Sequence, residues 1–320
     1  MKKQNRIILG ALFATIAIVG LSLLNGCQKT ATLSLGTVPT PAFDAVVAAD
    51  GHNVTLINKS SGASIAYYAA PDINLGYGEL QGDSAKVNFI FPGTYTIKML
   101  MVAQGGLDSL TKTVTTTQPD PNACSSTTAL GFLASCTQKT WTLNPAAGAF
   151  AVGQYAGDGG WWASGTAQVT ERPCLFNDEY TFKFNKAGDF IYNDHGDFWT
   201  DGGSDWPGGA GCYSSSQYSA GQQAWGSGNF HYVIIPGAGV KGLGQIKLIG
   251  SGAHFALQKP INGNDAPNVV TANSVTYDIW SMQPNLTDGG GTYDLLTVTL
   301  HYGNWSPTDG WWTYTFISRH

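Results

Sequence analysis

The sequence has little charge, and almost no clustered positive charge after its first few residues. Charged residues make up 12% of the 320-residue chain, and the formal net charge is −5. A nucleic-acid partner is therefore not expected, because phosphate recognition needs clustered lysine and arginine. Tryptophan is missing from the first 140 residues, although the chain contains ten. No internal repeat of about 20–50 residues is visible, which argues against solenoids and propellers.

What the sequence has in abundance is glycine, with 41 residues, and aromatic residues, with 12% of the chain. Such a composition can bury a core and differs from that of a disordered chain. It is typical of secreted all-β proteins. A length of 320 residues suggests two or three domains.

The N-terminus has the pattern of an export signal. Lys2, Lys3 and Arg6 precede an uncharged run from Ile7 to Leu24, which is just long enough to span a bilayer. The run is followed by Asn25-Gly26-Cys27 and then by polar residues. A small residue before cysteine, after such an apolar run, resembles a bacterial lipobox more closely than a plain signal peptide or a retained transmembrane helix. The resemblance implies that residues 1–26 are a signal peptide and that Cys27 is lipidated.

Residues 27–40 are rich in threonine, serine and proline and lack a hydrophobic period, so we expect a flexible tether. Gln28-Lys29 is similar to the start of a surface-export signal that follows the lipidated cysteine in some glycan-utilising bacteria. Thr30-Ala31 departs from the acidic part of that signal. The expected location is the outer membrane, with the protein lipid-anchored and exposed at the cell surface. The lipid anchor is the only expected membrane contact.

Four cysteines remain after Cys27, and in an exported chain they can form disulfides in three pairings. An oxidising compartment favours disulfides over metal binding. We predict the two local pairs, Cys124–Cys136 and Cys174–Cys212. Zinc is the weaker alternative, because the sequence has neither a CxxC motif nor a nearby pair of histidines.

Residues 41–118 have the pattern of a small all-β module. Val54–Asn58 alternates as a half-buried strand does, and Pro92-Gly93 is a turn before the long strand Thr94–Val102. A glycine turn then leads into a strand at Asp108–Thr115. This succession resembles the C-terminal half of a PKD (polycystic-kidney-disease) domain, although the usual Trp-Asp-Phe-Gly-Asp-Gly segment is missing. The resemblance implies an immunoglobulin-like sandwich that acts as a spacer.

Residues 119–136 are predicted to be a linker, since they begin with Pro-Asp-Pro, which favours extended chain. Residues 137–320 are the main domain, with roughly nine strands and glycine- and proline-rich connections. The predicted strands include Asp178–Phe184, Ala253–Leu257 and Trp311–Ile317. The predicted fold class is therefore all-β, with an immunoglobulin-like (PKD-like) module followed by a larger jelly-roll or other β-sandwich domain.

The segment from 151 to 210 combines acidic and aromatic residues. It contains nine acidic and three basic residues, with tryptophans among the acids. A pyranose ring has an apolar face that an aromatic ring can cover, and hydroxyl groups that carboxylates and amides can bind. Carbohydrate binding is therefore the favoured hypothesis. The candidate glycan-binding residues are Trp161, Trp199, Asp205, Trp206, Trp225 and Trp305.

Two other chemistries remain open. Glycoside hydrolysis needs paired carboxyl groups, but Asp178 and Glu179 are neighbours in a strand and should point to opposite faces. The Glu-x-Asp-x-x-Glu motif of laminarinase-like jelly rolls is absent, so no catalytic residue is predicted. A structural calcium ion is the second alternative, because the segment offers hard oxygen ligands. Its candidate ligands are Asn193, Asp194, Asp197 and Asp201.

The motif Asp158-Gly-Gly-Trp-Trp162 has a twin, Asp309-Gly-Trp-Trp312, near the end of the domain. If the first and last strands pair, the two motifs become neighbours. In a strand one member of each Trp-Trp pair should face inward, and Trp312 shares the parity of the aromatic residues that follow it. We therefore interpret the motifs as a structural seam, with Trp161 as a rim contact at most. The ligand platform is placed further along the chain.

The two Gly-Trp-Trp motifs, together with the segment from Arg172 to Phe182, resemble PKD-domain-containing surface glycan-binding lipoproteins of polysaccharide-utilisation loci. The resemblance implies a non-catalytic protein that binds polysaccharide, such as a laminarin-like β-glucan, by aromatic stacking. It also implies two partners, namely glycan-degrading enzymes and an outer-membrane importer of the same system. No cofactor is expected apart from the calcium alternative. A structural or adhesin-type surface lipoprotein is the alternative from a different class.

Overall fold

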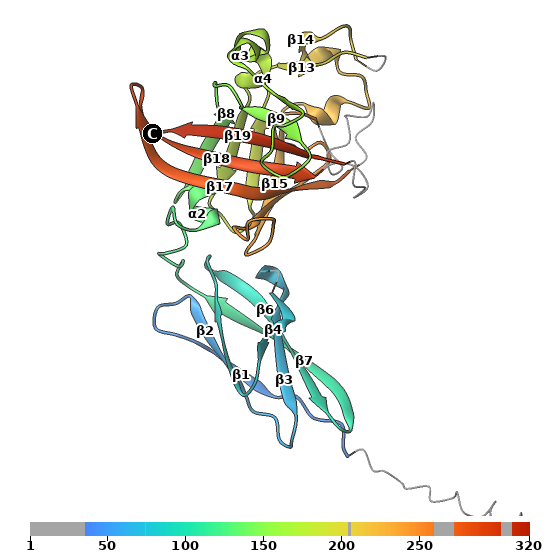
Figure 1. The fold of residues 1–320 in the computed structure, drawn as a ribbon. Coiled ribbons are helices and arrows are strands. Elements are labelled where there is room, and N and C mark those ends of the chain that lie inside the picture. Colours follow the sequence, from blue (N-terminus) through green and yellow to red (C-terminus); the bar gives the residue numbers. More distant parts are fainter. Residues whose placement is uncertain (1–35, 74, 204–205, 259–271, 302–308) are drawn as a thin grey trace, which may run out of the picture. The chain divides into compact units, whose positions relative to one another are not determined.

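A computed structural model of the chain describes residues 36–73, 75–203, 206–258, 272–301 and 309–320 (Figure 1). The chain divides into two compact units, the first ending at Gln118 and the second beginning at Pro119. Within the described residues, no helix has both the length and the apolar character that crossing a bilayer requires. The lipidation site predicted at Cys27 lies outside the described residues.

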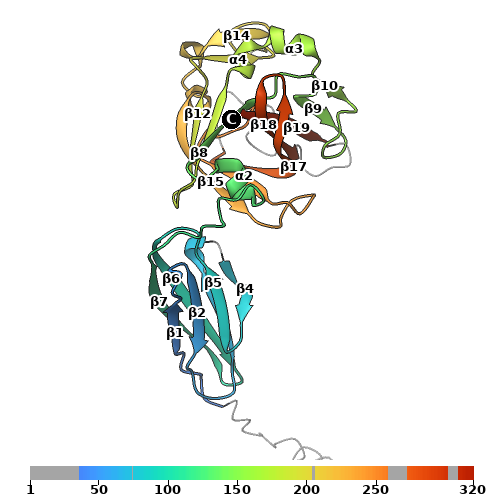
Figure 2. The ribbon, with the colours of Figure 1, turned by 90° about the vertical axis from the view of Figure 1, so that its left-hand side faces the viewer.

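The first unit is a sandwich of two antiparallel sheets (Figure 2). One sheet has the strand order β1-β2-β5, and the other has the order β4-β3-β6-β7. The strands are β1 (Phe43–Val47), β2 (Asn53–Asn58), β3 (Ile65–Ala70), β4 (Leu75–Gln81), β5 (Ser84–Asn88), β6 (Gly93–Ala103) and β7 (Gly106–Thr116). A short 3-10 helix, η1 (Pro71–Ile73), follows β3.

Alternating apolar residues explain why these strands form a sandwich. In β6, the side chains of Tyr95, Ile97, Met99 and Met101 are buried, and the residues between them are at least partly exposed. Successive side chains of a strand point to opposite faces, so this pattern gives one core face and one solvent face. The two-sheet arrangement is immunoglobulin-like, as the resemblance to PKD domains implied.

The second unit is built mainly of strands. These are β8 (Gln138–Leu143), β9 (Phe150–Gly153), β10 (Trp162–Ala163), β11 (Glu179–Lys183), β12 (Asp189–Asn193), β13 (Asp197–Thr200), β14 (Gly211–Ser214), β15 (Gly228–Ile235), β16 (Gln245–Ile249), β17 (Ser274–Asp288), β18 (Gly291–His301) and β19 (Trp311–Arg319). Its helices are short, and they are α2 (Ala129–Ala134), α3 (Thr166–Glu171), α4 (Pro173–Phe176), η2 (Ser215–Gln217) and η3 (Gln223–Trp225).

Eight of these strands form an antiparallel sheet that closes on itself. In chain order, β8, β11, β12, β15, β16, β17, β18 and β19 each pair with the next, and β19 returns to pair with β8. β9 pairs with β19 beside this ring and carries β10 at its own edge. The prediction of an all-β fold with a sandwich architecture is confirmed. The closed sheet of the second unit is a meander, because its strands pair in chain order. It is therefore not a jelly roll, which consists of two Greek keys.

Aromatic side chains fill the inside of the closed sheet. Phe255, from the segment between β16 and β17, reaches this core, where its ring centroid lies 5.5 Å from that of Tyr180. The sequence predicted a strand at Ala253–Leu257, but the structure shows an irregular buried segment. The reason is that the backbone N–H groups of Phe255 and Ala256 donate to the hydroxyls of Tyr277 and Tyr180, and not to a neighbouring strand.

The predicted linker at 119–136 is only partly a linker. Thr128 caps α2 by accepting a hydrogen bond from the N–H of Gly131 at 3.0 Å. Phe132 and Leu133 of α2 are buried in the core of the second unit. The predicted Cys124–Cys136 disulfide is present and closes this segment. The segment therefore belongs to the second unit, because its apolar helix face needs that core.

Candidate functional site

Two of the tryptophans predicted as the ligand platform are buried. Trp199 in β13 is 4% exposed and Trp225 in η3 is 0% exposed. An indole without an exposed face cannot stack on a sugar, so the prediction for these two residues is wrong. The physical reason is that the segment from β13 to η3 builds a small core of its own, in which Trp225 packs with Phe198 and Tyr218. Trp199 belongs to the main core.

Trp206 packs at the edge of this small core. It is half-buried, and its ring centroid lies 5.8 Å from that of Phe198 and 6.4 Å from that of Tyr218. Trp206 is therefore mainly a packing residue. The candidates Asp205 and Trp305 lie outside the described residues.

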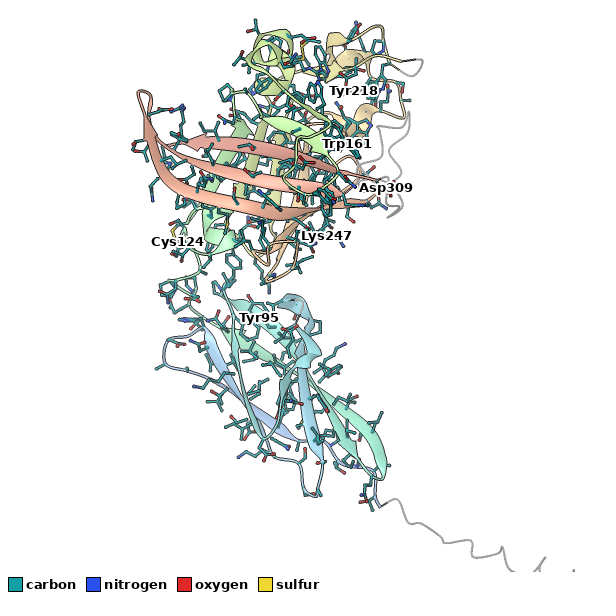
Figure 3. The ribbon with its side chains drawn as sticks, in the orientation of Figure 1. Tyr95, Cys124, Trp161, Tyr218, Lys247 and Asp309 are labelled. Carbon is teal, nitrogen blue, oxygen red and sulfur yellow. A yellow bond between two sulfur atoms is a disulfide. The ribbon has the colours of Figure 1, made fainter. Side chains whose placement is uncertain are left out.

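The exposed aromatic side chains gather elsewhere. Among the residues that the structure describes, the exposed Trp, Tyr and Phe side chains are Tyr155, Trp161 and Trp162, at 66%, 48% and 39%. All three lie in residues 154–162, which run from the end of β9 to the first residue of β10, and we call this segment the aromatic loop. Figure 3 shows Trp161 on the same side of the second unit as Asp309. Of these three residues, sequence reasoning had selected only Trp161.

Asp158 fixes the shape of the aromatic loop. Its carboxylate accepts hydrogen bonds from the backbone N–H groups of Gln154 at 3.2 Å and Gly160 at 2.8 Å. Its own N–H donates to the carbonyl of Tyr155 at 3.0 Å. Aspartates favour turns because their side chains can bond nearby backbone groups in this way. The loop is therefore held in shape before any ligand arrives, which reduces the entropic cost of binding.

The aromatic loop also rests on a neighbouring strand. Gly157 has a φ of +76° and lies against the indole of Trp280 in β17, so a side chain at position 157 would collide with that ring. The Nζ atom of Lys241 lies 4.2 Å from the centroid of the same indole. Trp280 therefore supports the loop and is itself half-buried.

The two Gly-Trp-Trp motifs are neighbours, as the sequence suggested. Trp312 in β19 lies opposite Val152 in β9, which in turn lies opposite Trp162 in β10. The ring of Trp161 lies against Gly310, where an added Cβ would come within 2.5 Å of it. Trp312 packs against the main core, as its parity predicted. The motifs form a seam, yet this seam leaves Trp161 and Trp162 exposed.

Arg172 lies behind Trp162. Its guanidinium carbon is 4.4 Å from the ring centroid of Trp199, 5.4 Å from that of Phe150 and 5.9 Å from that of Trp162. Its side chain is 12% exposed, and its Nη1 pairs with Asp201 at 3.2 Å. Cation–π contacts are strongest when the cation is desolvated. Trp199 thus supports the arginine that links the aromatic loop to β13. The sequence had marked Arg172 only as the start of a segment that carries the family resemblance, and gave no sign of this supporting role.

The second predicted disulfide, Cys174–Cys212, is present and holds the same junction. Cys174 lies in α4, two residues after Arg172, and its Cα is 5.9 Å from that of Cys212. Cys212 in β14 lies directly opposite Trp199 in β13. The disulfide therefore ties together the segments that carry Arg172 and Trp199.

The residues proposed as calcium ligands have partners within the protein. Asp194 accepts hydrogen bonds from the hydroxyls of Ser215 and Ser227. Asp201 accepts one from Trp199 Nε1 at 3.0 Å. The remaining candidates are Asn193 and Asp197, which also have side-chain partners. In the described part of the chain, no group of three or more His, Cys, Asp or Glu side chains is placed to hold a metal ion.

Asp178 and Glu179 point to different environments, as predicted for neighbours in a strand. Asp178 is 2% exposed, and it accepts hydrogen bonds from the hydroxyls of Tyr180 at 3.2 Å and Tyr192 at 3.1 Å. Burial raises the pKa of Asp178 well above its usual range. The Glu179 side chain is 42% exposed, and its carboxylate lies 3.4 Å from His195. Glycoside hydrolysis requires two carboxyl groups in one site, and these two carboxyl groups do not share a site.

Among solved structures, the chain is similar to the crystal structure of the PKD1 domain of Vibrio anguillarum Epp. The similarity has 18% sequence identity and a TM-score of 0.22, over 26% of this chain and 98% of that chain. No protein-family model matches the sequence, and no curated protein matches it. The function is therefore inferred from the aromatic loop and its supports.

Proposed function

We propose that the second unit is a non-catalytic carbohydrate-binding domain and that the aromatic loop is its binding surface. One observation carries the proposal: the exposed aromatic side chains of the described chain, Tyr155, Trp161 and Trp162, share one loop that Asp158 holds in shape. Exposed apolar patches beside polar groups mark interaction sites. Flat Trp and Tyr rings suit the apolar face of a pyranose, and their N–H and O–H groups can bond to its hydroxyls.

The proposal includes a setting for this surface. A lipid on Cys27 would hold the protein at the outer membrane, and the first unit would act as a spacer. The aromatic loop would then capture polysaccharide, such as a laminarin-like β-glucan, for degrading enzymes and an importer. Several anchored copies on one glycan chain would gain affinity through avidity.

Affinity electrophoresis in gels that contain laminarin, mixed-linkage β-glucan, mannan or xylan tests this function. We expect at least one polysaccharide to retard the native protein. Trp161→Ala should lose most of the retardation with little change in melting temperature, because this side chain is 48% exposed. Leu107→Ala, which changes a 62% exposed residue of the first unit, is the matched control and should behave as the native protein.

Two outcomes would contradict the proposal. The first is migration unchanged by every polysaccharide. The second is retardation that survives in the double variant Trp161→Ala with Trp162→Ala. Release of reducing sugar during incubation with any of the four polysaccharides would instead support the hydrolase alternative.

A further inference from the structure

A polar surface lies on the wall of the closed sheet opposite the aromatic loop. In the ring of eight strands, β15 is four strands away from β19, the strand to which β9 and the aromatic loop are attached. Figure 2 shows β12 and β15 on one side of the second unit, and β9 and β10 on the other. A pocket of about 220 Å³ opens over β12 and β15.

The strand pattern explains which side chains line this pocket. In β12, Phe190 and Tyr192 are buried, so Asp189 and Ile191 lie on the outer face. In β15, His231 lies directly opposite Asp189. The pocket is lined by Lys183, Asp189, Ile191, Asn229 and His231, together with parts of Phe190 and Phe230.

The carboxylate in the pocket is held in place. Asn185, in the hairpin turn between β11 and β12, donates from its Nδ2 to Asp189 Oδ2 at 2.9 Å. The Oδ1 atom of Asn185 accepts a hydrogen bond from the backbone N–H of Asp189 at 3.2 Å. On the other side, Asp189 Oδ1 lies 3.5 Å from His231 Nδ1. Both carboxylate oxygens thus have a fixed neighbour, while the Asp189 side chain remains 37% exposed and His231 58% exposed.

The mixture of groups defines the class of ligand. Asp189 would repel a carboxylate or phosphate that Lys183 attracts, and Lys183 would repel an amine that Asp189 attracts, so neither charge gains a net attraction from the pair. A neutral ring with several hydroxyl groups can donate to Asp189 and accept from Lys183, and the Asn229 amide can do both. Ile191 offers an apolar contact for the C–H groups of such a ring. A volume of about 220 Å³ is below the roughly 300–1,000 Å³ of pockets for drug-sized ligands, so the pocket suits a single sugar unit.

We propose that this pocket is a second carbohydrate site, which takes one neutral sugar unit, such as a chain end or a side branch. The site is independent of the aromatic loop, because the two lie on opposite walls of the ring. Two sites facing in opposite directions let one molecule join two glycan chains, which raises the avidity of a lipid-anchored array.

Saturation-transfer-difference NMR on the full chain tests the pocket. The neutral probes are the methyl glycosides of glucose, galactose, mannose and xylose, and the charged probes are glucuronate and glucosamine. We expect a signal from at least one neutral probe. His231→Ala and Asp189→Asn should each reduce that signal at least fivefold, with near-ultraviolet circular dichroism unchanged. Lys247→Ala, on the neighbouring strand β16 and outside the pocket, is the matched control.

The double variant Trp161→Ala with Trp162→Ala separates this site from the aromatic loop. We expect the methyl glycoside signal to persist in this variant, even though polysaccharide retardation is lost. The pocket is refuted if no neutral probe gives a signal, if a charged probe gives the stronger one, or if the signal survives both pocket variants. A signal that disappears with the two tryptophans would assign all binding to the aromatic loop. A persistent signal without any polysaccharide retardation would leave the pocket standing and remove the proposed function.

Discussion

Replacing Arg172 with lysine should destabilise the second unit although the positive charge is kept. The guanidinium carbon lies 4.4 Å from the Trp199 ring and within 6 Å of the rings of Phe150 and Trp162, at 5.4 and 5.9 Å. A planar guanidinium stacks on aromatic faces, whereas an ammonium is a compact and strongly hydrated charge. Since the Arg172 side chain is only 12% exposed, we expect the loss of these contacts to cost about 1–2 kcal/mol.

This loss can be measured in the intact chain. All ten tryptophans lie after position 140, so tryptophan fluorescence follows the unfolding of the second unit alone. For a domain of about 150–250 residues, 1 kcal/mol changes the melting temperature by roughly 2–4 °C. Arg172→Lys should therefore lower the fluorescence-detected melting temperature by about 2–8 °C. Trp162 should also become more accessible to acrylamide quenching, because the group behind its ring is lost.

Two further variants decide which contact of Arg172 matters. Asp201 is 68% exposed, so its ion pair with Arg172 contributes at most about 1 kcal/mol, and Asp201→Asn should shift the melting temperature less than Arg172→Lys. Arg319→Lys is the matched control, because Arg319 also pairs with an aspartate, Asp288, and lies 5.2 Å from an aromatic ring, that of Tyr293, but at an exposed position. It should lower the melting temperature less than Arg172→Lys does, because its contacts are exposed to solvent. If Asp201→Asn and Arg172→Lys lower it equally, the ion pair and not the ring stacking holds this junction, and the reasoning is refuted.

The other predictions concern buried groups and cross-links. Trp199→Ala should lower the free energy of unfolding by about 3–5 kcal/mol in urea titrations, and a loss below 1 kcal/mol would contradict the burial of this indole. Removing the Cys174–Cys212 disulfide should lower the free energy of unfolding by about 4 kcal/mol, and removing Cys124–Cys136 should lower it by about 3 kcal/mol. The difference arises because the two disulfides close loops of 38 and 12 residues. Urea titrations of the paired serine variants measure both losses, and the reverse order would count against this reasoning. Burial lowers the pKa of His254 to about 4. Between pH 6.5 and 4 the unfolded chain therefore binds a proton at this residue more readily than the folded protein does. The free energy of unfolding should be unaffected by this residue above pH 6.5 and should fall by about 3 kcal/mol in all as the pH drops towards 4. His254→Phe should remove this pH dependence from the unfolding free energy, and an unchanged pH profile would show that other groups cause it.

Local patterns in the sequence predicted much of the fold. The alternation within Val54–Asn58 identified a half-buried strand, in which Val54 and Leu56 are buried, because side-chain parity depends only on the residues within that strand. The disulfides Cys124–Cys136 and Cys174–Cys212 could be predicted because both join cysteines close in sequence in an exported chain. The closure of the sheet through Phe316 and Leu143 was not predictable in this way, because the pairing is long-range and leaves no local periodicity.

The exposure of individual tryptophans was beyond the sequence for a different reason. Trp199 and Trp161 both lie near glycine and aspartate residues, so their local sequences resemble each other. The two indoles differ in the segments that cover them. Trp199 is covered by Arg172 from a distant segment, whereas Trp161 lies on a loop beside the last strand. The Asp158-Gly-Gly segment did contain a usable signal, since aspartate followed by glycine favours a shaped turn.

The topology of the second unit explains why its exposed rings lie at the seam. Each strand of the closed ring has a neighbour on both sides, so its inward side chains are committed to the core. β9 and β10 extend the sheet beside the ring, and β10 ends it with only two residues. At this edge, large aromatic side chains can stay exposed without opening the core, while β19 and Trp280 still support the loop from beneath. A structural seam and a binding surface are therefore compatible here, because the pairing that places β9 against β19 also fixes the position at which Tyr155, Trp161 and Trp162 meet solvent.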